Sequence, residues 1–235
     1  MIYLKKIFKT ILISLIALLV ISLIYLSQNK FIIKKTMSHS DIEYIYLDPG
    51  HGGIDGGGVS KTGVHEKEIN LNICFYLKDY LQNSGYRVKM TRTGDYDLAS
   101  KNSKNRKHDD ILKRVNLINN NNTVLFISVH CNIYSDSNIH GAQTFYKSNN
   151  IESKKLSESI QEKITNILKN TDRKAKSITD KYIIENTNKT GSLVEVGFLS
   201  NDKELELLTS KTYQDLIAYC IYIGIIDYLG TTNKI

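Results

Sequence analysis

Residues 46–53 read Tyr-Leu-Asp-Pro-Gly-His-Gly-Gly, which is the end of an apolar strand followed by a glycine-rich turn. The turn contains Pro49, the only proline in the 235 residues. Glycine has no Cβ that would obstruct a cation or a substrate, and proline fixes φ, so this turn can hold the ring of His51 in one direction. The pattern is typical of a loop that presents a histidine to a metal ion.

Outward from this turn, the patterns of strands and helices alternate. Short apolar or alternating runs predict strands, and apolar residues at helical spacing predict helices. The predicted strands are 44–47, 86–90, 124–129, 141–146, 182–184 and 193–196, and the predicted helices are 66–84, 109–120, 152–168 and two that begin at 202 and 213. We therefore expect one α/β domain at 44–230, with a mostly parallel, twisted sheet and helices on both faces.

The amino terminus predicts a membrane segment at 1–27. Three lysines precede the apolar run Ile11–Leu26, and no small-x-small cleavage site follows it. We expect an uncleaved anchor helix rather than a removed signal segment, with a polar connector at 28–43. The positive-inside rule places the lysines in the cytoplasm and the domain outside it.

The charge distribution argues against nucleic acid as a partner. The net charge is +7, but six of the 31 basic residues lie in the first 35 positions, where there is no acidic residue. The remaining 25 basic and 24 acidic residues nearly balance. The predicted domain therefore has no basic excess to bind a phosphate backbone.

The three cysteines, Cys74, Cys131 and Cys220, are far apart and lie in apolar or strand-end contexts. They indicate neither a disulfide framework nor a zinc knuckle. Cys131 next to His130 is a nucleophile in principle, but successive residues of a strand point to opposite faces, so Cys131 would point away from that histidine.

Four residues stand where a catalytic metal site would need them. His51, His130 and Glu195 fall at the carboxyl ends of predicted strands, where parallel sheets bind ligands, and Glu66 opens a helix. Two imidazoles and a carboxylate with a fourth position open for water are a recurring catalytic zinc set. Glu68 is the rival of Glu66, and Asp48 and Asp55 are further carboxylate candidates, although Asp48 before proline more plausibly shapes the turn.

Glu195 is flanked by apolar residues, where an ionised carboxylate is unfavourable without a partner. Burial raises the pKa of a carboxyl group toward the range in which it exchanges protons with a reacting water. The sequence thus predicts either a general base or a carboxylate paired with Arg92 or Arg114. Ile69 excludes the HExxH arrangement that His65 and Glu66 would otherwise begin.

Five segments together resemble the zinc-dependent N-acetylmuramoyl-L-alanine amidases, in family order over 44–229. They are 47–53, 66–68, 90–92, 128–132 and 193–201. The resemblance implies zinc on His51, Glu66 and His130 and Glu195 as general base. It also implies substrate contacts at Asn132, Arg92 and Gln143, and the amide between the lactyl group of N-acetylmuramic acid and L-alanine as the substrate.

Segments 97–99, 141–146 and 173–176 are similar to the germination-specific spore-cortex members of that family. This similarity implies action on peptidoglycan of the spore cortex, followed by a partner deacetylase that generates muramic-δ-lactam. An activating accessory protein is a further open question. The alternatives are a vegetative amidase of cell separation, a zinc peptidase and a non-catalytic peptidoglycan-binding module. Gly191 departs from the proline that many members have there, which leaves the rigidity of that segment open.

Overall fold

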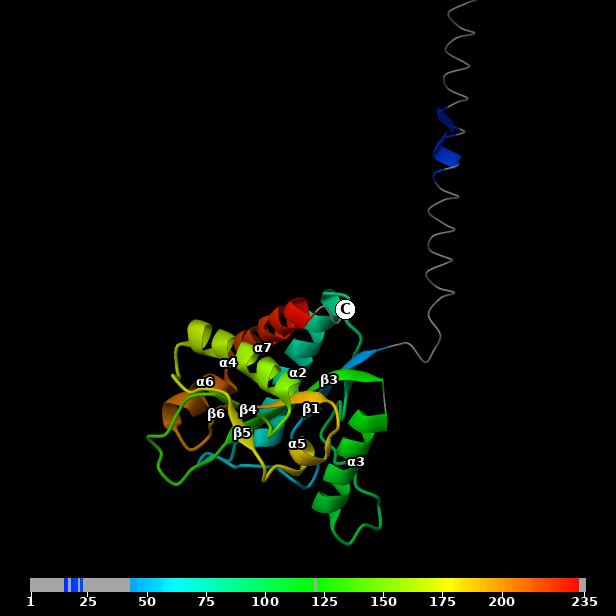
Figure 1. Ribbon diagram of the computed structural model, residues 1–235. Coiled ribbons are helices and arrows are strands. Elements are labelled where there is room, and N and C mark those ends of the chain that lie inside the picture. Colours follow the sequence, from blue (N-terminus) through cyan, green and yellow to red (C-terminus); the bar gives the residue numbers. More distant parts are fainter. Residues whose placement is uncertain (1–14, 17, 21, 23–42, 121, 233–235) are drawn as a thin grey trace, which may run out of the picture. The chain divides into compact units, whose positions relative to one another are not determined.

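The computed structural model describes residues 15–16, 18–20, 22, 43–120 and 122–232 (Figure 1). The chain separates into two compact units, Met1–Ile42 and Glu43–Ile235. The predicted membrane segment and connector lie largely outside the described residues. Among the residues that are described, no helix is long and apolar enough to cross a membrane.

Six strands form one sheet in the order β2-β1-β3-β6-β4-β5. Their bounds are β1 Tyr44–Pro49, β2 Val88–Met90, β3 Thr123–Asn132, β4 Gln143–Lys147, β5 Lys176–Ile178 and β6 Thr190–Phe198. Neighbouring strands run parallel except β4 and β6, which are antiparallel. The expected mostly parallel sheet is confirmed, with one antiparallel pairing that makes it mixed.

Helices cover both faces of the sheet, as predicted (Figure 1). One face packs against α2 (Glu66–Asn83), α4 (Ile151–Leu168) and α7 (Lys211–Thr232), and the other against α3 (Arg106–Asn120) and α5 (Tyr182–Asn186). Helix α6 (Asp202–Thr209) leads into α7. The alternation of β1 explains the two cores, since Ile45 and Leu47 join the first and Tyr46 joins the second.

One predicted strand is wrong. Residues 182–184 begin helix α5, and the neighbouring strand is β5, which the pattern missed. A three-residue apolar run does not distinguish strand from helix, and here Ile183 and Ile184 are both buried against the second core. Strand β5 reads Lys-Ser-Ile and is mostly exposed at the sheet edge, so it carries no apolar signal.

Strands β1, β3 and β6 are neighbours in the sheet. β3 pairs with β1 on one side and with β6 on the other, and both pairs run parallel. Their carboxyl ends therefore meet at one edge of the sheet. The turn after β1 and the start of α2 lie at this same edge, because Gly58 O accepts a hydrogen bond from Glu66 N.

Candidate metal centre and active site

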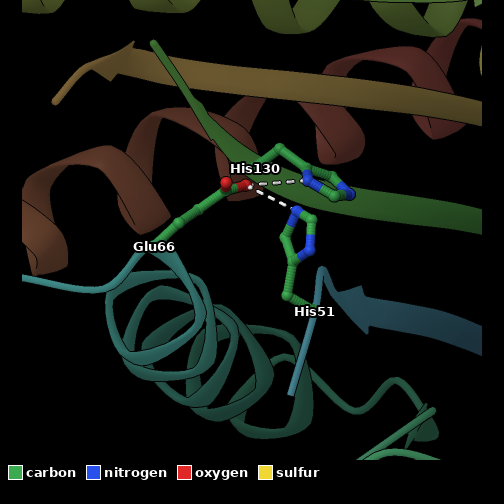
Figure 2. A group of neighbouring side chains, drawn as sticks. All are labelled: His51, Glu66 and His130. Carbon is green, nitrogen blue, oxygen red and sulfur yellow. Dashed lines mark hydrogen bonds and ion pairs between the residues drawn. The ribbon is translucent and has the colours of Figure 1, made fainter. Parts of the chain in front are cut away.

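His51, Glu66 and His130 come together at this edge (Figure 2). Each offers one potential ligand atom, and these atoms lie within 4.8 Å of one another. Glu66 Oε1 is 2.9 Å from His130 Nδ1 and 3.3 Å from His51 Nε2. The structure thus groups the three residues that the sequence proposed as metal ligands, from three separate elements of the fold.

Two glycines make room for this cluster. A Cβ on Gly50 would collide with the imidazole of His130, and one on Gly57 would lie 2.6 Å from Glu66 Oε2 and 2.7 Å from the ring of His51. His51 itself has a positive φ of 63°, which is unusual for a residue with a side chain. The glycine-rich turn is therefore shaped to hold these side chains close together.

The carboxylate of the cluster is Glu66 and not Glu68. Glu66 is buried as the first residue of α2, whereas Glu68 is exposed. Backbone N–H groups of Gly58 and Cys131 donate to the two oxygens of Glu66 at 2.8 and 3.0 Å, and Asn70 Nδ2 lies 3.2 Å from Oε1. These donors fix the carboxylate in one orientation, which a metal ligand requires.

Asp55 and Asp48 have supporting positions. Asp55 Oδ2 lies 2.8 Å from His51 Nδ1, on the opposite side of the ring from the nitrogen that faces Glu66. Such a contact selects the tautomer and orientation of a metal-binding histidine. Asp48 accepts hydrogen bonds from Thr91 and Ser128, which agrees with the expected role in shaping the turn.

Two buried arginines hold the turn in place. Arg92 donates to the carbonyls of Pro49, Gly50, Lys67 and Gly94, and Arg114 donates to those of Pro49 and His51. Both side chains are about 1% exposed. Arg92 was expected to contact substrate, but its guanidinium is buried and engaged with backbone carbonyls, so in this structure it positions the His51 turn.

The donor set fits zinc. Burial lowers the pKa of His51, but hydrogen bonds with Asp55 and Glu66 outweigh this effect and raise it to about 9. Burial likewise opposes ionisation of Glu66, yet contacts with His130 and His51 hold its pKa well below the usual range. Asp55 and Glu66 therefore favour positive charge at the ring of His51. Two imidazoles and one carboxylate at mutual ligand distance match a catalytic zinc set.

Glu195 lies beside the cluster. It is aligned with His130 in the parallel pairing of β3 and β6 and is only 6% exposed. Burial raises the pKa of its carboxyl group, which His130 and Lys181 partly oppose. Oε2 is buried and has no hydrogen-bond partner in the described part of the chain, while Oε1 is 3.8 Å from Lys181 Nζ.

The alternative pairing of Glu195 with Arg92 or Arg114 is wrong. Arg114 instead forms ion pairs with Asp48 and Asp110, and Arg92 binds carbonyls. Lys181, which the sequence did not single out, is the cation nearest to Glu195 among the described residues. No local pattern could have identified it, because its contact with Glu195 depends on how the segment before α5 packs against β6.

The two other expected substrate contacts, Gln143 and Asn132, lie at the ends of strands. Gln143 is aligned with Glu195 in the antiparallel pair, and its side chain contacts Arg173 and the carbonyl of Lys174. Asn132 ends β3 and is partly exposed.

Cys131 is buried and burial raises the pKa of its thiol well above the usual value, which disfavours a nucleophilic thiolate.

Gly191 lies inside β6. The packing around it explains why this chain has glycine where many family members have proline. A Cβ there would collide with the ring of Phe126, and Gly191 N donates to Ser153 Oγ at 3.0 Å. Proline has no N–H to make this bond. The segment is therefore a buried strand and not a loosened loop.

Comparison with known proteins agrees with this site. A family model described as N-acetylmuramoyl-L-alanine amidase matches residues 45–227. The germination-specific N-acetylmuramoyl-L-alanine amidase of Bacillus subtilis (strain 168) is 46% identical over 187 residues, covering 78% of either chain. LytC, an N-acetylmuramoyl-L-alanine amidase of the same organism, is 32% identical over 79% of this chain and 35% of its own length.

Solved structures show the same fold. The CwlD amidase from Clostridioides difficile, solved in complex with the GerS lipoprotein, superposes with a TM-score of 0.78 at 40% identity, covering 80% of this chain and 98% of CwlD. An N-acetylmuramoyl-L-alanine amidase from Clostridium difficile 630 gives a TM-score of 0.73 at 28% identity, with 82% and 100% coverage.

Proposed function

The chain belongs to the N-acetylmuramoyl-L-alanine amidase family, and from this premise we propose how its residues act and where. As a peptidoglycan amidase it hydrolyses the amide that joins the lactyl group of N-acetylmuramic acid to L-alanine of the stem peptide. One observation supports these residue roles most strongly. Three side chains that can bind a metal meet at one edge of the sheet, together with the buried Oε2 of Glu195, which has no hydrogen-bond partner in the described part of the chain.

His51, Glu66 and His130 would hold one zinc ion per chain. Zinc in such a site acts as a Lewis acid on the amide carbonyl and makes a water molecule more acidic. Asp55 keeps the Nδ1 side of His51 engaged, so that Nε2 faces the cluster. Arg92 and Arg114 hold the backbone of the turn, which keeps His51 in its strained conformation.

Glu195 is the proton carrier in this proposal. Its carboxylate accepts a proton from the attacking water at Oε2, the oxygen that has no protein partner. The attack on the carbonyl carbon forms the new C–O bond. The same carboxyl group then donates that proton to the nitrogen of L-alanine as the C–N bond breaks. The raised pKa of Glu195 suits both steps, because a group that is too acidic would not take the proton.

Asn132 and Gln143 are proposed substrate contacts. Gln143 is aligned with Glu195 at the start of β4, Asn132 ends β3 two residues after His130, and both are partly exposed. Asn132 Oδ1 accepts a hydrogen bond from Ile133 N, which leaves its amide N–H groups to donate to a substrate carbonyl or hydroxyl.

We propose that the substrate lies in the spore cortex. The support is the 46% identity to a germination-specific amidase and the likeness to CwlD. In this role the amidase removes stem peptides from muramic acid, and a partner deacetylase then produces muramic-δ-lactam. Because CwlD was solved with the GerS lipoprotein, a lipoprotein is also a candidate accessory partner of this chain.

We further propose that residues 1–27 anchor the domain to the membrane, with the domain outside the cytoplasm. The support is the sequence alone, in the lysines that precede the apolar run Ile11–Leu26. Fractionation of cells that express the full chain tests the anchor, which predicts protein in the membrane pellet that detergent releases.

Mass spectrometry of digested cortex fragments tests the reaction. Free stem peptides that begin with L-alanine are the expected product. Shortened stems still attached to muramic acid would show a peptidase instead, and unchanged fragments that stay bound to the protein would show a binding module.

A further inference from the structure

A pocket of about 420 Å³ opens beside the candidate metal centre. His51 and His130 form part of its wall, so the pocket is continuous with the reacting centre. Another part of the wall comes from Lys107 and His108 at the start of α3 and from Tyr182 at the start of α5. None of these three residues has a role in the mechanism above.

The acidic residues of this wall are engaged within the protein. Asp48 and Asp110 both pair with Arg114, and Asp110 also accepts from Leu98 N. Asp55 contacts His51 Nδ1 through one oxygen and Gly57 N through the other. These carboxylates therefore have little capacity left to attract a cationic ligand.

Two side chains of the pocket wall, Lys107 and Tyr182, can donate hydrogen bonds to a ligand. The side chain of Lys107 is 76% exposed, and its ion pair with Asp55 spans 3.8 Å. Such a long, exposed pair contributes little and leaves the ammonium free to turn to a ligand. Tyr182 is 39% exposed, and its hydroxyl has no hydrogen bond within the described part of the chain. Its ring meets that of His108 edge to face, with 6.1 Å between centroids.

Lys181 adds positive charge next to this wall. It directly precedes Tyr182, is 44% exposed at its side chain and lies 3.8 Å from Glu195 Oε1. A carboxylate held at Lys107 would thus lie in a pocket whose most exposed charged side chain is a lysine, with a second lysine next to its wall, and a bound metal would add further positive charge.

Resting on the proposed function, we propose that this pocket binds a free carboxylate of the stem peptide, with Lys107 as its cation and the Tyr182 hydroxyl as a hydrogen-bond donor. The glycan side of the substrate offers hydroxyl and acetamido groups without charge near the scissile amide, whereas the peptide side bears acidic residues. Ammonium and hydroxyl donors match a carboxylate and bind it through charge-assisted hydrogen bonds. The pocket therefore receives the leaving-group side of the substrate.

Two muramoyl dipeptides test this proposal. Both carry L-alanine followed by the same acidic residue, with one of its two carboxyl groups blocked as a methylamide in both substrates. The other carboxylate, the one that is free in the stem peptide, is free in one substrate and converted to an amide in the other. For the wild-type protein loaded with zinc, we expect kcat/KM to be about three- to tenfold higher for the free acid, mainly through KM. Lys107→Gln should bring this ratio close to one, Lys107→Arg should preserve much of it, and Tyr182→Phe should reduce it.

The ratio cancels effects on folding or on the metal centre, because both substrates use the same protein. Lys104→Gln is the matched control, since Lys104 lies in the same basic segment but outside the pocket wall, and it should keep the wild-type ratio. Equal cleavage of both substrates by the wild type, or an unchanged ratio in Lys107→Gln and Tyr182→Phe, would overturn the subsite and leave the amidase reaction standing. Cleavage of neither substrate would overturn the amidase assignment and the subsite with it.

Discussion

Arg114 Nη1 lies 2.9 Å from Asp48 Oδ1, and both side chains are 1% exposed. The two residues are 66 positions apart in sequence and join α3 to the end of β1. Arg114 also donates to the carbonyl of His51 at 2.6 Å. This buried ion pair therefore connects the core of the fold directly to the turn that presents a candidate metal ligand.

Asp48→Asn should lower the free energy of unfolding by about 3 kcal/mol. The change leaves part of the charge of Arg114 buried without its partner, and breaking such pairs is strongly destabilising. Urea denaturation measures the difference. Glu158→Gln, which removes an exposed pair with Lys154, is the control and should change the free energy by less than about 0.5 kcal/mol. An equal loss in both variants would contradict a structural role for the buried pair.

The contribution of the Asp48 carboxylate to the free energy of unfolding should vanish in acid. Burial opposes its ionisation, but Arg114 and the hydroxyls of Thr91 and Ser128 outweigh this effect and hold its pKa below the ordinary value. A lowered folded-state pKa gives stability that is present above the unfolded pKa of about 3.9 and is lost as pH falls through the folded pKa. The gap in unfolding free energy between wild type and Asp48→Asn should therefore be constant from about pH 7 to pH 5 and narrow below about pH 4. A gap that stays constant in acid would contradict the lowered pKa.

The sequence predicted most of the fold and the centre of the site because both depend on local patterns. His51 follows a strand in a glycine-rich turn, His130 ends a strand and Glu66 opens a helix, and parallel strands bring their carboxyl ends together. The partners of Arg92, Arg114 and Glu195 were not predictable in this way. They depend on which side chains meet across elements far apart in sequence, and the short apolar run at 182–184 took its helical form from tertiary packing.

Glu195→Gln should lower kcat by about 10² to 10⁴ and leave the zinc content unchanged. The amide cannot accept a proton from water, but in our proposal this side chain is not a metal ligand. Cleavage of muropeptides and metal analysis of the same preparation measure the two effects. Glu206→Gln, at an exposed position of α6, should behave as wild type. Near wild-type turnover in Glu195→Gln would disprove the role of this residue.

Removal of zinc with a chelator should abolish cleavage, and added zinc should restore it. Zinc should also raise the melting temperature, because a ligand that binds only the folded state stabilises it. His130→Ala should lose both the bound zinc and this thermal shift, since His130 provides one of the three grouped ligand atoms. His140→Ala should keep both, because His140 is exposed, lies outside the grouped ligand residues, and its ring makes its one hydrogen bond among the described residues to the carbonyl of Asn138. Zinc retained in full by His130→Ala would contradict the ligand assignment.

Deletion of the gene should give spores that form normally but lack muramic-δ-lactam and fail to complete germination. If residues 1–27 anchor the domain as proposed, it would reach only the wall near one membrane, since the connector spans at most about 55 to 60 Å when fully extended. Such an amidase modifies cortex locally and does not dissolve the wall of the growing cell. Muropeptide analysis of purified spores measures the lactam, and the full chain should restore it whereas the chain with Glu195→Gln should not. Spores of the deletion strain that retain all their lactam would contradict the cortex role, and chains of undivided cells would favour the vegetative alternative.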